Sequence, residues 1–176
     1  MSEARSNPRE PDAGEVLRSP ALLLATWFGT GLAPRAPGTV GSVAALPCCV
    51  MALLYLPPWA VLVTAGGLLC VGSWAAAVAG QRWGQVDHGA IVIDEVLGQL
   101  IAVALPFYVL APEAVGPGFW LLALALFRVF DIAKPWPVSY FDQHMKSALG
   151  VMLDDVAAGI GAGLVAIAMW VGWAAV

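Results

Sequence analysis

Acidic side chains stand inside otherwise apolar stretches of this sequence at three places. Asp94 and Glu95 are adjacent in one stretch, Asp131 lies in a second, and Asp154 and Asp155 are adjacent in a third. A charge at the centre of a bilayer costs roughly 2.5–3.5 kcal/mol, so acids there need compensation. A divalent cation supplies it, because Mg²⁺ prefers hard carboxylate oxygens and completes its shell with substrate phosphate. We therefore predict that all five carboxylates are metal ligands and that one of them is a general base.

Two bases offer a second kind of compensation. Arg128 and Lys134 are each three residues from Asp131, which places them on its helical face and lets them pair with it. We expect both bases to hold phosphate oxygens as well. Two alternatives stay open: the acids are solvated or paired in the headgroup layer and only orient the helices, or they form a proton or ion path.

A Gly- and Pro-rich segment, residues 28–42, has the composition of a phosphate-binding turn. Gly38 lets the backbone approach a ligand closely, and Thr39 and Ser42 offer hydroxyl groups. Arg35 offers a planar fork of donors, and the start of the following helix offers unpaired N–H groups. The segment is not a Walker A loop, because no Gly-Lys-Ser/Thr follows at the required spacing. A purely structural turn explains the same composition.

One histidine lies beside an acid in the loop before the Asp94 stretch. His88 follows Asp87 and is a candidate proton donor, although a solvated loop histidine is the commoner case.

The elements that must position these residues are membrane helices. Of the 176 residues, 60% are hydrophobic and 11% are charged, and the mean hydropathy is +0.82, whereas a soluble domain has about 25% charged residues. A spanning helix needs roughly 17–25 residues, and apolar runs near that length lie at residues 39–56, 59–80, 91–111, 119–133 and 151–176. We predict an all-α, polytopic membrane protein with about four to five spanning helices. The net charge of −4 gives no support for a nucleic-acid partner.

Two segments precede the first apolar run. Residues 1–19 are polar and lack the apolar run of a signal peptide, so we predict a disordered cytoplasmic tail. Residues 21–28 are apolar but too short to span, and we predict that they lie at the interface or re-enter the membrane. Residues 20–176 then form one membrane domain, with no obligate protein partner evident.

Threading the five runs with the N-terminus inside gathers the bases at one side. The bases on that side are Arg5, Arg9, Arg18, Arg35, Arg82, Arg128, Lys134 and Lys146. The positive-inside rule makes this side cytoplasmic. The five embedded acids fall at the same side, and Glu113 is the acid assigned to the opposite side.

Four strings of residues, in this order, resemble the phosphatidylglycerophosphatase A family. They are the turn at 29–42, Val92-Ile93-Asp94-Glu95 with Gly98, Phe127-Arg128-Val129-Phe130-Asp131 with Lys134-Pro135-Trp136-Pro137, and Leu153-Asp154-Asp155-Val156-Ala157-Ala158-Gly159. The Asp87-His88-Gly89 loop also matches, and the resemblance covers about residues 21–167. It implies an inner-membrane, Mg²⁺-dependent lipid phosphatase that converts phosphatidylglycerophosphate to phosphatidylglycerol and inorganic phosphate, with its active site on the cytoplasmic face.

Three other classes compete with this interpretation. A CDP-alcohol phosphotransferase needs Asp-Gly and Ala-Arg followed by Gly and two Asp at fixed spacing, and that pattern is absent from the sequence. An ion or proton transporter is the main alternative, although the outer halves of the predicted helices carry no acid along a path. A purely structural membrane subunit would tolerate alanine at every acid.

Overall fold

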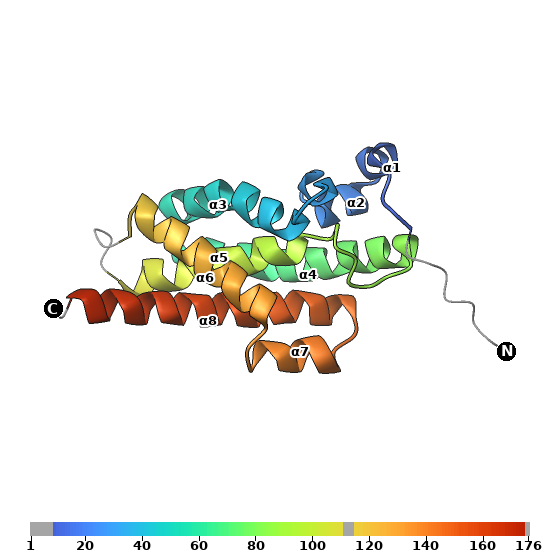
Figure 1. Ribbon diagram of the computed structural model, residues 1–176. Helices are drawn as coiled ribbons and strands as arrows, with labels where there is room; N and C mark the ends of the chain where they lie inside the picture. The colour runs from blue at the N-terminus through green and yellow to red at the C-terminus, as the bar shows by residue number, and fades with distance from the viewer. Residues whose placement is uncertain (1–8, 111–114, 175–176) are drawn as a thin grey trace.

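The structure is a computed structural model that describes residues 9–110 and 115–174, and every element in these ranges is helical (Figure 1). This confirms the predicted all-α fold. In chain order the elements are α1 (Ala13–Arg18), α2 (Pro20–Ala25), the 3-10 turn η1 (Thr30–Leu32), α3 (Pro37–Tyr55), α4 (Pro58–Trp83), α5 (Ile93–Val109), α6 (Pro117–Ala133), α7 (Val138–His144) and α8 (Ala148–Ala174).

Three of the helices are long and apolar enough to cross a membrane. These are α3, α4 and α8, with 19, 26 and 26 residues in their apolar spans and mean hydropathies of 1.7, 1.9 and 1.8. Helices α5 and α6 have 17 residues each, which is about the lower limit for a span. The protein is therefore a membrane protein, and a total of four or five spans stays a prediction. Glu113 and the end of the predicted third run lie outside the described residues.

Proline and left-handed residues set the ends of these helices. Helices α2, α3, α4 and α6 each have proline in the first turn, where the missing N–H costs nothing and the fixed φ suits the helix. Gly84 ends α4 and Lys134 ends α6, both with a positive φ. The left-handed backbone turns the chain away from the helix axis. This direction change matters for Lys134, whose side chain leaves the face of α6.

Helix α5 packs most extensively against α8, and glycine makes the approach close. A Cβ on Gly159 would lie 2.4 Å from the Gly98 carbonyl oxygen, and a Cβ on Gly98 would lie 2.4 Å from the Phe127 ring. Small residues at such crossings let helix backbones approach in a membrane. Because Asp94 is four residues before Gly98 and Asp155 is four before Gly159, this contact brings the two acids to one level.

One end of the bundle gathers the short helices. Figure 1 shows α1, α2 and α7 at the end where α3 and α8 begin, while α8 ends at the opposite end. Helix α2 packs against α4 with Leu22 and Ala25 buried, and it does not span, in agreement with the sequence.

The predicted disordered tail is wrong for residues 13–18, which form α1. Asp12 caps this helix by accepting a hydrogen bond from the Glu15 N–H, and Val16 is fully buried. Glu15 forms ion pairs with Arg9 and Arg82. The cap and the ion pair with Arg82 at the end of α4 order a segment whose polar composition alone indicated disorder. Residues 1–8 lie outside the described residues.

Candidate metal and phosphate site

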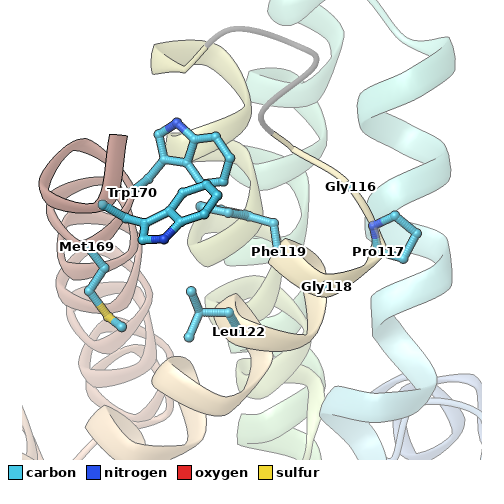
Figure 2. A pocket seen from close by; sticks show the side chains of 8 residues that line it. Gly116, Pro117, Gly118, Phe119, Leu122, Met169 and Trp170 are labelled. Atoms are coloured by element: carbon cyan, nitrogen blue, oxygen red, sulfur yellow. The ribbon is translucent and has the colours of Figure 1, made fainter. Parts of the chain in front are cut away.

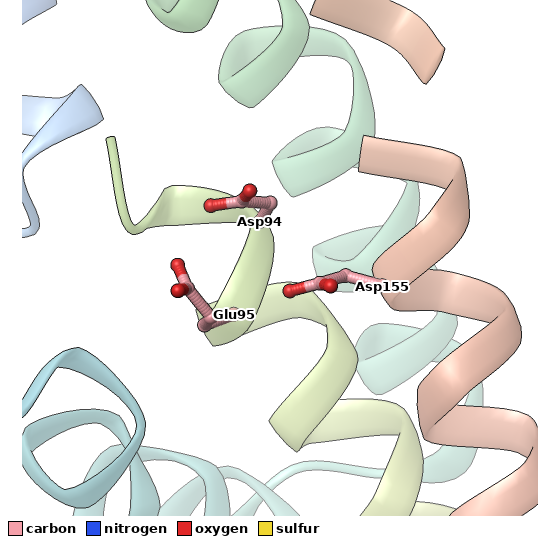
Figure 3. Close-up of side chains that lie close together, drawn as sticks. All are labelled: Asp94, Glu95 and Asp155. Atoms are coloured by element: carbon pink, nitrogen blue, oxygen red, sulfur yellow. The ribbon is translucent and has the colours of Figure 1, made fainter. Parts of the chain in front are cut away.

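Three of the five embedded acids converge between α5 and α8. Asp94 and Glu95 lie in the first turn of α5, Asp155 lies on α8, and their ligand atoms are all within 4.8 Å of one another. Figure 3 shows the three carboxylates turned toward a common space. Asp94 is 7% exposed and Asp155 is 3% exposed. We call these three residues the carboxylate cluster.

The carboxylate cluster has the donor set of a divalent cation site. Asp94 Oδ1, Glu95 Oε2 and Asp155 Oδ2 are buried without a hydrogen-bond partner among the described residues. Buried like charges repel and lose their hydration, so three ionised carboxylates need a cation or protons between them. Hard carboxylate oxygens are the ligands that Mg²⁺ prefers. The residues present therefore fit such an ion.

Asp131 and Glu95 share one arginine. Arg128 Nη1 lies 2.5 Å from Asp131 Oδ2 and 3.6 Å from Glu95 Oε1, and it donates to Ser42 Oγ at 3.4 Å. The predicted pairing of Arg128 with Asp131 is confirmed. Asp131 thus has a counter-ion, and Arg128 joins α6 to α3 and α5 beside the carboxylate cluster.

Asp154 faces a different partner from its neighbour Asp155. Lys134 Nζ donates to Asp154 Oδ2 at 2.7 Å and to Asp142 Oδ1 at 2.6 Å. We call Lys134, Asp142 and Asp154 the lysine clamp, because it joins the end of α6 to α7 and α8. The predicted pairing of Lys134 with Asp131 is wrong, since the positive φ of Lys134 ends α6 and takes its side chain off that face.

The lysine clamp keeps its ammonium group charged. Partial burial lowers the pKa of Lys134, but the hydrogen bonds and charges of Asp142 and Asp154 outweigh it and raise the pKa above the ordinary value. The hydrogen bond from Lys134 correspondingly lowers the pKa of Asp142. Asp142 and Asp154 also line a cavity of about 190 Å³ together with the exposed Asp87.

The glycine-rich turn lies directly against the carboxylate cluster. A Cβ on Gly38 would lie only 2.0 Å from Glu95 Oε1, so glycine is needed there for the close approach of α3. The Ser42 hydroxyl is buried and donates to the Gly38 carbonyl at 2.8 Å. Thr39 is partly exposed, and Arg35 is exposed and has no ion pair among the described residues.

His88 is fixed within its loop. Its Nδ1 accepts a hydrogen bond from the Ala90 N–H at 3.2 Å, and its ring centroid lies 5.1 Å from that of Trp83. A ring that accepts at Nδ1 carries its proton at Nε2 when neutral. Burial lowers the pKa of His88, and the nearby Asp87 and Glu10 charges offset this only in part.

Two residues were absent from the sequence-based site, one that pairs with Lys134 and one on the helix of Asp94 and Glu95. Asp142 is the second partner of Lys134, and Gln99 is a fully buried amide on α5. Gln99 carried a usable signal, because it is the one side-chain amide inside the apolar run 91–111. Asp142 gave no comparable signal, since it follows the helix break in a polar stretch.

A cavity of about 500 Å³ lies at the other end of the bundle and has a different character. It lies between the start of α6 and the end of α8, and its side chains include Phe119, Leu122, Met169 and Trp170 (Figure 2). These residues are apolar and offer no acid, base or nucleophile. The chemistry of the described residues therefore concentrates at the end that holds the carboxylate cluster.

The chain is similar to proteins whose names describe a phosphatase. A protein from Escherichia coli named phosphatidylglycerophosphatase A is 37% identical over 160 residues, covering 87% of each chain. One of the same name from Haemophilus influenzae is 38% identical over 153 residues, covering 87% of this chain and 90% of that protein. A Bacteroides thetaiotaomicron protein named "Putative phosphatidylinositol-3-phosphatase" is 36% identical over 155 residues, covering 85% and 94%. No solved structure matches.

The family model described as phosphatidylglycerophosphatase A matches residues 23–170. This range contains α3, α5 and α6 in full and α8 as far as residue 170, and it includes every predicted site residue, from Arg35 to Asp155. The relatives are named as phosphatases, and the match extends over most of the chain. The chain therefore belongs to the phosphatidylglycerophosphatase A family of membrane phosphatases.

Proposed function

We propose that the protein hydrolyses phosphatidylglycerophosphate to phosphatidylglycerol and inorganic phosphate in a Mg²⁺-dependent reaction. The carboxylate cluster is the observation that carries this proposal. The buried Asp94 and Asp155 and the mostly buried Glu95 come from two helices and carry unpartnered oxygens, in a chain of a family named for this activity. The substrate presents a terminal phosphomonoester, which is the group that a carboxylate-bound divalent cation attracts.

Asp94, Glu95 and Asp155 are the residues that we assign first to the metal. When bound, Mg²⁺ would neutralise phosphate charge and act as a Lewis acid on the phosphoryl oxygens. Asp131 and Asp154 are further ligands in our proposal. Both are ion-paired, to Arg128 and Lys134 respectively, so each would have to exchange part of its contact with a base for contact with the ion.

Phosphate contacts come from three bases and the start of α3 in our proposal. Arg35 is exposed and has no ion pair among the described residues, so it is the base best placed to meet an incoming phosphate. Arg128 and Lys134 would bind phosphate oxygens once their carboxylate partners turn toward the cation. The first N–H groups of α3, around Gly38 and Thr39, have no intrahelical carbonyl to bond and can donate to phosphate oxygens.

The proton balance of the reaction needs one base and one acid. A carboxylate of the site takes a proton from the attacking water, whose oxygen bonds to phosphorus as the bond to the glycerol oxygen breaks. The glycerol oxygen then needs a proton, and His88 is our candidate donor. Ser42 has a positioning role, because its hydroxyl joins the Gly38 carbonyl to Arg128.

We place the site at the cytoplasmic face of a bacterial inner membrane. Arg9, Arg18, Arg35 and Lys146 belong to the short helices and loops at this end of the bundle, and Arg82 lies in the last turn of α4. An excess of bases on one side favours the cytoplasm for that side. The proposed partners are the lipid substrate and the membrane, and no second protein is needed to complete the site.

Phosphate release by the detergent-purified protein tests the proposal. We expect inorganic phosphate from phosphatidylglycerophosphate with Mg²⁺ and none with EDTA, and slower release from phosphatidate and phosphatidylinositol 3-phosphate. Release that EDTA does not affect would remove the metal from the proposal. No release from folded protein, together with ion flux in liposomes, would favour the transporter alternative instead.

A further inference from the structure

Buried polar atoms without partners concentrate around one residue that the site does not yet include. Eight side-chain atoms in the described residues are buried without a hydrogen-bond partner, and six of them belong to Asp94, Glu95, Gln99, Arg128 and Asp155. Gln99 contributes both of its amide atoms, Nε2 and Oε1, and it is 0% exposed. The molecule thus holds a complete, unpaired amide in its interior beside the carboxylate cluster.

Folding alone gives no reason for an amide at this position. Burying a polar group without a hydrogen bond is unfavourable, and in a lipid-embedded bundle no bulk water can satisfy it. Methionine or leucine would fill similar space without that penalty. Buried polar groups without a hydrogen-bond partner concentrate at functional sites. We therefore expect Gln99 to have a hydrogen-bond partner when the protein is active.

Two neighbouring residues, Glu95 and Arg128, each carry one buried polar atom without a hydrogen-bond partner. Glu95 is four residues earlier on α5, a spacing that places the two side chains on one face as neighbours. Glu95 Oε2 is a buried acceptor without a donor, and Arg128 Nε is a buried donor without an acceptor. Arg128 already lies beside Glu95, 3.6 Å from its other oxygen.

Helix α6 passes α5 at the level of Gln99. The Phe127 ring lies against Gly98, the residue before Gln99, so closely that a Cβ on Gly98 would be 2.4 Å from it. Arg128 is the next residue on α6. Glu95 and Gln99 lie on α5 and Arg128 lies on α6, and the two helices are in contact at this level.

We propose that Gln99 is a positioning residue that connects Arg128 to Glu95. Its Oε1 accepts a hydrogen bond from Arg128 Nε, and its Nε2 donates to Glu95 Oε2 when the Glu95 carboxylate turns to hold the cation. This inference rests on the proposed function. The arrangement uses all four unpaired atoms of the three residues, and it orients Glu95 by the outer hydrogen bond that ligating carboxylates ordinarily receive.

Gln99→Met tests the proposal, since methionine keeps the length of the side chain and removes both polar atoms. Outer-sphere partners of metal ligands are typically worth about 10- to 100-fold in metal affinity or activity. We expect Mn²⁺ affinity, measured by electron paramagnetic resonance on purified protein, to fall by about tenfold or more. We expect kcat to fall with it at saturating Mg²⁺, while KM for the lipid and the Tm of metal-free protein do not fall.

Leu97→Met is the matched control, because Leu97 is equally buried on the same helix and has no polar atom. It is expected to leave metal affinity and kcat unchanged. Gln99→Leu provides a second apolar replacement if Gln99→Met does not fold, and it is expected to give the same loss of Mn²⁺ affinity.

The outcomes separate this inference from the proposed function. If the wild type releases phosphate and Gln99→Met matches it in Mn²⁺ affinity and kcat, Gln99 has no positioning role and the proposed function stands. If the wild type releases no phosphate, the proposed function fails and Mn²⁺ affinity alone decides the role of Gln99. A fall in Tm with unchanged Mn²⁺ affinity would make Gln99 a structural residue and overturn the inference.

Discussion

Asp154 and Asp155 are neighbours on α8, both are buried, and they have opposite surroundings. Asp154 faces Lys134 and belongs to the lysine clamp, whereas Asp155 faces α5 and belongs to the carboxylate cluster. The clamp supplies its own counter-ion, and the cluster holds unpartnered oxygens. The fold thus pairs Asp154 with a base and places Asp155 beside two other acids. This difference indicates that the clamp joins helices, and it supports our proposal that the cluster binds a cation.

Asp155→Asn gives the largest expected effect, because it removes a ligand from the cluster and leaves the clamp intact. A metal ion that stabilises phosphoryl charge is worth several kcal/mol, so we expect phosphate release to fall by about a thousandfold. Removing one of three neighbouring carboxylates relieves repulsion, so the Tm of metal-free protein should not fall. Full turnover by the variant would exclude Asp155 from the site.

Gly38→Ala tests the cluster from the side of α3. The new Cβ would lie 2.0 Å from Glu95 Oε1 and must displace that carboxylate. Misplacing a reactive group by about 1 Å can cost roughly 100-fold in rate, and we expect a loss of that order. Gly66→Ala is the matched control, since a Cβ on Gly66 meets no atom within 4 Å. Equal activity of the two variants would mean that Glu95 has no part in the reaction.

His88→Gln tests a residue that belongs neither to the carboxylate cluster nor to the lysine clamp. Burial lowers the pKa of His88 below its ordinary value of 6.5. The protonated fraction of His88 therefore grows as the pH falls below neutrality. If His88 donates a proton, wild-type kcat rises from pH 8 to pH 6. The variant should lose that rise and be slower by about tenfold at pH 6. Superimposable pH profiles of kcat would assign His88 a structural role in its loop.

Asp142→Asn gives the smallest expected effect on activity, because it weakens the clamp and leaves the cluster intact. We expect phosphate release to fall by less than about fivefold. The Tm should fall by about 2–4 °C, since one partly exposed ion pair is lost. A thousandfold loss of activity at unchanged Tm would place Asp142 in the reaction and remove the distinction between clamp and cluster.

The ion pair between Lys134 and Asp142 also makes the stability of the protein depend on pH. The hydrogen bond from Lys134 lowers the folded pKa of Asp142, so its stabilising effect is complete above the unfolded pKa of about 4. It is lost as the pH falls through the lower folded pKa. Thermal unfolding of the wild type and Asp142→Asn between pH 3 and pH 6 should therefore converge toward the acidic end.

The helices and the gathering of acids could be predicted from the sequence, because both follow from hydropathy along the chain. The partner of each acid could be predicted only where helical spacing applied. Arg128 lies three residues before Asp131 within α6, and its pairing followed from that spacing. Lys134 lies three residues after Asp131, but the helix ends there with a positive φ, so the spacing rule failed.

The separation of Asp154 from Asp155 depends on the rotation of α8 against α5. Both acids stand in the same apolar context, and hydropathy does not distinguish them. Gly98 and Gly159 carry the missing information, since each lies four residues after an acid of the cluster and the two glycines meet in the structure. The order in α1 was missed for a similar reason, because its ion pair with Arg82 joins segments far apart in the sequence.

Crystals soaked in Mn²⁺ test the central claim most directly, since the anomalous signal locates the ion. The account predicts a peak about 2.1 Å from carboxylate oxygens of Asp94, Glu95 and Asp155, and no peak there in Asp155→Asn. A peak at Asp142 and Asp154 instead would contradict the account, because the clamp rather than the cluster would then be the metal site. Protein that releases phosphate yet shows no peak at the cluster would contradict it equally.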